Sequence, residues 1–122
     1  MIKQVRQIGI PVQKMERAVQ FYKELLELQL LFETNTMAFF NCNDLRLLLS
    51  IPENKKFANA SSTVYFEVDE IEATYTRLQK NGVMFTSKPH VVAKRDDTET
   101  WMAFFQDSEQ NTHAITSEVS IK

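Results

Sequence analysis

The fold is decided by the stretch from Ile8 to Leu28, which reads IGIPVQKMERAVQFYKELLEL. Its first part has an apolar residue at every second position, which is the spacing of a strand with one buried face. Its second part has apolar residues, Phe21 among them, at helical spacing. We therefore expect a strand over residues 5–12 and a helix over residues 15–26.

The same order of elements occurs a second time along the chain. After the first helix, extended segments are expected at residues 28–32, 37–41 and 45–51. A second strand and helix follow at residues 63–68 and 69–80, and the extended segments after them are 83–86, 91–94, 100–106 and 111–116. Because repeats decide architecture, we interpret each half as strand, helix and three strands, with one extended segment more in the second half.

Turn and capping residues set the expected boundaries. Asn43 and Asp44 predict a hairpin turn, and Gly82 predicts the end of the second helix. Asp69, with Glu72 three residues later, approximates a capping box. We expect one domain over residues 1–122, built from a first module at 1–52, a polar connector at 53–62 and a second module at 63–120.

Composition excludes several classes of function. The 122 residues are 43% hydrophobic and 25% charged, and the net charge of −2 gives no electrostatic case for nucleic acid. No apolar run is long enough to span a membrane, and the two glycines argue against a phosphate-binding loop. The single cysteine, Cys42, excludes an intrachain disulfide and favours the cytoplasm.

The repeated order resembles the vicinal oxygen chelate superfamily, which includes glyoxalase I, extradiol dioxygenases, fosfomycin-resistance enzymes and bleomycin-resistance proteins. The resemblance rests on the stretch already quoted and on FEVDEI at 66–71, LQKNGV at 78–83 and FFQDSEQN at 104–111. It implies an α+β fold of paired βαβββ modules, with a curved mixed sheet around a cleft and helices outside. The chain departs from the family pattern at Glu27, Ser108 and Gln110, where the family usually has glycine, proline and glycine.

The resemblance also indicates where a metal would be held. Metal-using members have four converging ligands, two per half, and the matching positions here are Gln7, Leu48, Thr63 and Ala114. A divalent metal needs three or four N, O or S donors, whereas leucine and alanine offer none. We therefore expect no metal and no cofactor at these positions.

The expected cleft lining is mostly apolar and aromatic, which is usual for a small-molecule pocket. Arg46 offers a fork for an acidic group, Tyr65 and Trp101 offer stacking faces, and Gly9 and Ala114 make room. Ala103 is a further candidate for this face. The predicted ligand-binding residues are Gln7, Arg46, Leu48, Thr63, Tyr65, Glu67, Trp101, Phe105 and Ala114. The alternative is that this face is filled by its own aromatic side chains or by a second subunit.

No catalytic group is identified by the sequence. Glu67 is a weak candidate for a general base, although a solvated carboxylate is the commoner case. His113 is expected to pack on the face opposite Ala114, and His90 is expected to be solvated. Cys42 has no base placed beside it and is interpreted as structural or inert.

Three functions from different classes remain open. The first is a metal-free protein, similar to bleomycin-resistance proteins, that binds a small and possibly aromatic molecule and forms a homodimer. The second is a metal-dependent lyase, isomerase or dioxygenase, which would need other ligands such as His90, His113, Glu67 or Glu118. The third is a structural or interaction domain, so whether the protein is an enzyme stays undecided.

Overall fold

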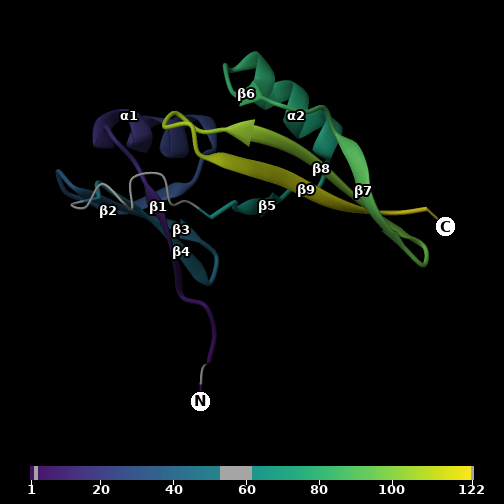
Figure 1. Cartoon of the computed structure of the whole chain (residues 1–122), viewed down its shortest axis with the longest axis horizontal. Helices are drawn as coiled ribbons and strands as arrows, with labels where there is room; N and C mark the ends of the chain where they lie inside the picture. Colours follow the sequence, from purple (N-terminus) through teal and green to yellow (C-terminus); the bar gives the residue numbers. More distant parts are fainter. Residues whose placement is uncertain (2, 53–61, 122) are drawn as a thin grey trace. The chain divides into compact units, whose positions relative to one another are not determined.

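The protein is described by a computed structural model that covers residue 1 and residues 3–52 and 62–121 (Figure 1). The chain forms two compact units, Met1–Ser62 and Thr63–Lys122, each with its own mixed sheet. The fold is thus α+β, as expected. Apart from Ser62, the expected connector at 53–62 lies outside the described residues.

The first unit contains a four-stranded sheet in the order β1-β4-β3-β2. The first strand pairs parallel with the last, and the other two contacts are antiparallel. Asn43, with a φ of 59°, lies in the predicted turn between β3 and β4. The strands are β1 (Gln7–Pro11), β2 (Gln29–Glu33), β3 (Met37–Cys42) and β4 (Leu45–Ser50).

The helical segment of the first unit packs on one face of this sheet. It begins as α1 (Met15–Gln20) and continues as a wider π-helical turn, η1 (Phe21–Leu25). Tyr22 is fully buried, and its ring lies 5.9 Å from the ring of Phe40 on β3. The buried side chains of Ile10, Leu49 and Ala38 share this face because their positions are paired across the strands, and Leu47 joins them two residues before Leu49 on β4.

The second unit repeats this plan with one difference. Its sheet has the order β5-β9-β8-β6, with β7 also paired to β8. The first strand again pairs parallel with the last, and β8 and β9 are antiparallel. Two strands, β6 and β7, share the edge that β2 occupies alone in the first unit. The strands are β5 (Tyr65–Glu67), β6 (Met84–Phe85), β7 (His90–Arg95), β8 (Thr98–Gln106) and β9 (Thr112–Ser120).

The helix of the second unit, α2 (Ile71–Lys80), lies against β8 and β9 (Figure 1). Its residue Tyr75 contacts the ring of Phe85 at 4.6 Å, and Phe85 in turn contacts Phe105 at 5.6 Å. The predicted capping box at Asp69 is wrong, because the helix is capped at Glu70 without a side-chain hydrogen bond. The predicted end is confirmed, since Gly82 has a φ of +100° just after the helix.

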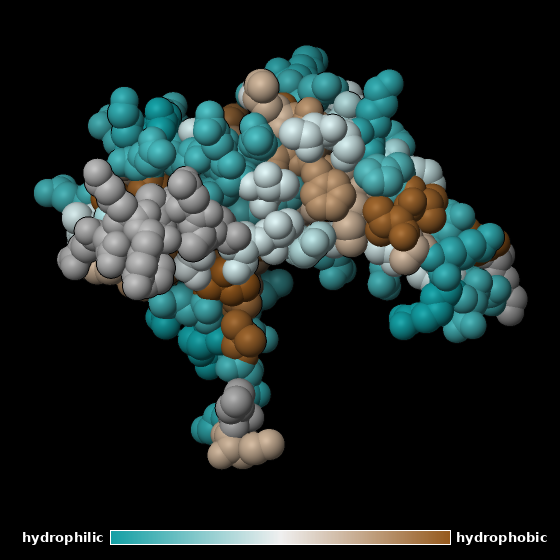
Figure 2. Space-filling model, viewed as in Figure 1, coloured by the Kyte–Doolittle hydropathy of each residue, from teal (hydrophilic) through white to brown (hydrophobic). Residues whose placement is uncertain are grey.

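The surface in view is mostly hydrophilic (Figure 2). A compact hydrophobic patch is visible over β7, where Val91 and Val92 are 40% and 43% exposed. Among the described residues, no helix is long and apolar enough to cross a membrane.

Candidate functional site

The face of the first sheet that lies opposite the helix carries a row of polar side chains. Paired positions run across all four strands from Gln29 through Asn41 and Arg46 to Gln7. Directly paired residues point to the same side of a sheet, so these four side chains are neighbours. The Asn41 amide nitrogen donates a hydrogen bond to the Gln29 side-chain oxygen at 3.2 Å.

A second row beside it is apolar. It runs from Phe32 through Phe39 and Leu48 to Gly9, again across the four strands. The Phe32 and Phe39 rings lie 6.2 Å apart, and Phe32 is 58% exposed. A Cβ atom built on Gly9 would meet no atom within 4 Å, so the row ends in open space. We call the two rows together the open face of the first sheet.

The two rows are joined by Arg46 and Phe39. The guanidinium carbon of Arg46 lies 5.9 Å from the centre of the Phe39 ring, within the range of a cation–π contact. A hollow of about 300 Å³ lies beside Arg46, and its lining consists of Arg6, Leu31, Asn41, Asn43, Asp44 and Arg46. Sequence reasoning found Gln7, Gly9, Arg46 and Leu48 on this face. It missed Phe39, which the alternation of β3 about the buried Phe40 would have revealed, and Phe32, which is paired with Phe39 on β2.

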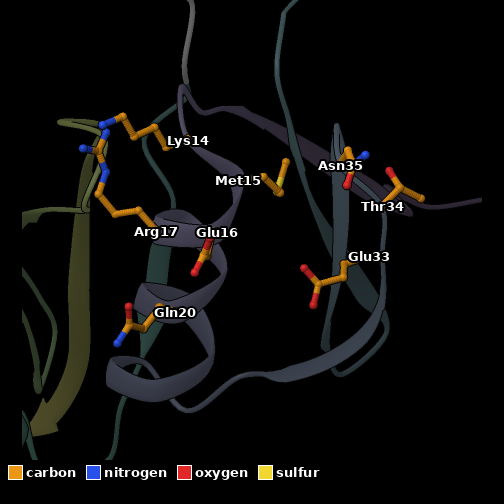
Figure 3. Close-up of a pocket in the computed structure, with 8 residues that line it drawn as sticks. All are labelled: Lys14, Met15, Glu16, Arg17, Gln20, Glu33, Thr34 and Asn35. Atoms are coloured by element: carbon orange, nitrogen blue, oxygen red, sulfur yellow. The ribbon is translucent and has the colours of Figure 1, made fainter.

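A larger hollow of about 780 Å³ lies between α1 and the end of β2 (Figure 3). Figure 3 shows Glu16 and Gln20 on one wall, Glu33 and Thr34 on the other, and Met15 between them. Charged and amide side chains dominate this hollow. It therefore lacks the apolar body and the few polar groups that are typical of a small-molecule site.

The register of the second sheet corrects part of the predicted lining. Tyr65 is paired with Ala114, and Ala114 with Phe104, so these three side chains share the face opposite α2. The Tyr65 and Phe104 rings lie 6.4 Å apart, while Ala114 is fully buried. Glu67, Thr116 and Met102 form the next row on this open face of the second sheet.

Trp101, Ala103 and Phe105 point the other way. Phe105 is paired with His113 and packs in the ring cluster beneath α2. Trp101 and Ala103 point to the same side as Phe105, because every second residue of a strand shares a face. The expectation that these three side chains share a face with Tyr65 and Ala114 is therefore wrong, because the pairing of β8 and β9 puts Phe104 opposite Ala114.

His113 is fully buried in a polar network on the helix side of the second sheet. Its Nδ1 accepts a hydrogen bond from the backbone N–H of Val64 at 3.2 Å, and its Nε2 lies 3.8 Å from the Asp107 carboxylate. Burial lowers the pKa of His113, and the Asp107 charge opposes that shift. Asp107 also accepts hydrogen bonds from Asn111 and from the backbone N–H of Glu109.

The remaining candidates are not gathered around one point. Thr63 is exposed and precedes β5, and Glu67 and Glu118 are exposed. His90 is exposed, as expected, and its Nδ1 lies 2.7 Å from the Lys88 carbonyl oxygen. In the part of the chain that the structure describes, no three His, Cys, Asp or Glu side chains form a group able to hold a metal.

Comparison with known proteins identifies the family. The profile of the Glyoxalase/Bleomycin resistance protein/Dioxygenase superfamily matches residues 4–115, which is nearly the whole chain. The chain belongs to this superfamily. The glyoxalase-superfamily relationship inferred from the repeated motifs is thus confirmed.

Individual proteins resemble this chain in sequence or in fold over most of its length. An uncharacterized protein YraH of Bacillus subtilis is 29% identical over 119 residues, which span 86% of this chain and 91% of that protein. The lactoylglutathione lyase of Agrobacterium tumefaciens has a TM-score of 0.76 at 15% identity, with 96% and 95% of the two chains covered. TnmS3, an antibiotic binding protein from Streptomyces sp. CB03234, has a TM-score of 0.77 at 21% identity, with 97% and 98% covered. At these identities the two solved structures show a shared fold.

The donors at the four positions that match the superfamily's metal ligands do not suit a divalent ion. In the first unit, Leu48 has no donor atom, and Gln7 is paired with Arg46, whose charge repels a cation. In the second unit, Ala114 is a buried methyl group and Thr63 is a neutral hydroxyl. The four residues offer one amide and one hydroxyl, fewer than the three or four donors that a metal site needs.

Proposed function

We propose that this glyoxalase-superfamily protein binds a small, planar organic molecule on its open sheet faces, without a metal at the four matching positions. The observation that carries the proposal is the open space above Gly9 at the end of an apolar row. An apolar surface beside a few fixed polar groups is the usual composition of a small-molecule site. The residues proposed to line it are Gln7, Gly9, Phe39, Arg46, Leu48, Thr63, Tyr65, Glu67, Phe104 and Ala114.

A similar fold is used for binding elsewhere. TnmS3 is named as an antibiotic binding protein, and this chain shares its fold over nearly its whole length. The absence of suitable donors at Gln7, Leu48, Thr63 and Ala114 favours binding over the metal-dependent lyase, isomerase or dioxygenase chemistry considered from the sequence.

The protein is also proposed to form a homodimer. Phe32 on the edge strand β2 is exposed, and exposed sheet edges are commonly covered by a partner. Sedimentation at micromolar concentration should show a dimer, and its symmetric interface should bury more than about 1,000 Å². A monomer would contradict this part of the proposal and leave the binding function to be tested separately.

The proposed setting is the cytoplasm. Cys42, the one cysteine, is partly exposed and free. A free thiol is typical of a reducing compartment.

Binding is tested by thermal unfolding with a library of planar aromatic compounds, in the presence and absence of a chelator. A ligand present at 100 times its Kd stabilises the folded state by about 2.7 kcal/mol, which gives a clear shift in Tm. The variant Gly9→Leu should abolish the shift, since its side chain would occupy the open space above the sheet. The matched control is Ala73→Leu, on the exposed side of α2.

The outcomes separate the three functions. Shifts that persist with chelator and disappear in Gly9→Leu support the proposal. Shifts that require added metal favour the enzyme alternative. A dimer that binds no compound, and that Gly9→Leu dissociates, would identify the open face as a protein interface and overturn the proposal.

A further inference from the structure

The charged side chains beside the open face of the first sheet favour a ligand with a negative charge. Arg46 lies on β4, between β1 and β3, so strands on both sides hold its backbone in place. Within the described residues, Arg46 makes no ion pair with a carboxylate, and the contact found for it is with the Phe39 ring. Its guanidinium donors are therefore available to a ligand.

A second guanidinium lies at the same hollow. Arg6 lines it together with Arg46, and Arg6 Nη1 lies 3.5 Å from the backbone carbonyl oxygen of Asp44. The Asp44 carboxylate offsets one of the two positive charges, so the hollow keeps a net positive charge. A cationic ligand would be repelled here, whereas an anionic one would be attracted.

The arrangement of the two rows on the open face indicates the shape of the ligand. The Arg46 side chain begins in the polar row and lies over Phe39 in the apolar row. Leu48 and the space above Gly9 continue the apolar row away from the charge. A molecule that fits both rows has a flat apolar body and one acidic end.

We propose that the ligand of the open face is a planar aromatic acid, with its ring over Leu48 and Gly9 and its carboxylate on the Arg46 guanidinium beside Phe39. This inference rests on the proposed binding function and narrows its ligand class. Guanidinium and carboxylate groups match as two parallel hydrogen bonds, which gives orientation as well as affinity.

The test compares an acid with its uncharged amide. Calorimetric titration of the wild-type protein with 2-naphthoate and with 2-naphthamide at low salt should show tighter binding of the acid by about tenfold or more, as a hydrogen-bonded charge pair implies. Arg46→Gln should reduce this ratio to near one, because the acid loses more affinity than the amide. Arg95→Gln, which removes the same charge at an exposed position next to the β7–β8 turn, should keep the full ratio.

Gly9→Leu provides the second measurement. It should abolish binding of both compounds while the circular dichroism spectrum stays that of the wild type, because a Cβ atom at this position meets no atom within 4 Å. Equal binding of acid and amide, both lost in Gly9→Leu, would overturn the acid inference and leave the binding function supported. Failure of naphthoate to bind at all would also overturn the inference, and the wider library with neutral and cationic members then decides the binding function separately.

Discussion

Two residues have the backbone conformation that the superfamily usually gives to glycine. Glu27 has a φ of 58° at the exit of η1, and Gln110 has a φ of 69° in the turn between β8 and β9. Both stand where the superfamily motif has glycine, so the sequence departs from the motif while the backbone keeps its shape. A side chain in the left-handed region is strained, and that strain should be measurable.

We predict that Gln110→Gly raises the free energy of unfolding by about 1 kcal/mol, because glycine adopts a positive φ without the steric cost that glutamine has. The side chain is exposed, and the backbone hydrogen bond from Gln110 to the Asp107 carbonyl is kept. Urea unfolding measures the change. The same substitution in a helix, Gln79→Gly, should lower stability by about 1 kcal/mol. A loss of stability in both variants would show that the turn does not hold residue 110 in the left-handed region.

The buried His113 predicts a pH dependence of stability. Burial lowers its folded-state pKa below the usual value of about 6.5, so the unfolded state binds more protons between the two values. The stabilisation from a neutral His113 is therefore complete above about pH 6.5 and is lost as the pH falls below it. Protonation would also place a hydrogen on Nδ1, the atom that accepts from Val64.

The comparison that isolates this effect uses His113→Gln and His90→Gln. Between about pH 7 and pH 5, stability of the wild type should fall by up to about 1.4 kcal/mol per pH unit more than stability of His113→Gln. His90→Gln, which removes the other histidine at an exposed position, is the matched control. Identical slopes in all three proteins would mean that His113 binds a proton as readily when folded as when unfolded.

At the scale of elements, the alternation and helical spacing of the sequence predicted most of the strands and both helices. Two features were beyond those patterns. The π-helical turn Phe21–Leu25 has apolar positions that also suit an α-helix, so helical spacing alone does not distinguish the two. The segments 83–86 and 91–94 were correctly expected as two strands, but the patterns did not show that β6 and β7 both pair with β8 at one edge of the second sheet.

The sequence of β8 alone does not show which of its side chains point toward α2. Phe104 and Phe105 are both large and apolar, so hydrophobicity does not choose which of them points toward α2. The pairing across the turn decides this, and a shift of one residue moves every side chain to the other face. For that reason the prediction that Tyr65 and Ala114 share a face was right. The prediction that Trp101 and Phe105 lie on that same face was wrong.

We predict that Phe21→Ala lowers the free energy of unfolding by about 3–5 kcal/mol, the range for truncation of a buried aromatic side chain. Phe21 is 7% exposed, and its ring packs edge-on against Tyr22 at 5.4 Å. The control is Lys23→Ala in the same turn, where the side chain is exposed and a change within about 0.5 kcal/mol is expected. Chemical unfolding monitored by circular dichroism measures both. A small effect for Phe21→Ala would mean that η1 does not anchor the helix to the first sheet.

At the scale of the whole molecule, the sequence was sufficient for the family and for the order of elements, because short motifs repeat at fixed spacing. It was insufficient for the ligand, the partner and the way the two open faces are used. An apolar face that binds a small molecule and one that binds a second subunit have the same composition. The contact between Arg46 and Phe39 favours a small-molecule ligand, and only the structure shows this contact.

We predict that the assembled protein binds no divalent metal ion stoichiometrically. Purified protein incubated with Zn²⁺, Ni²⁺ or Mn²⁺ and then desalted should retain far less than one ion per chain, and ligand binding should survive chelation. The variant that combines Leu48→Glu, Thr63→His and Ala114→Glu, with Gln7 kept, restores the donors that superfamily members use.

Ala114 is fully buried, so a glutamate there would be costly without a cation to offset its charge. Metal should therefore raise the Tm of the triple variant and leave that of the wild type unchanged. A stoichiometric ion in the wild type would refute the metal-free proposal. A folded triple variant whose Tm ignores metal would show that the four positions do not converge, and the assignment of the ligand positions from the family motif would then be wrong.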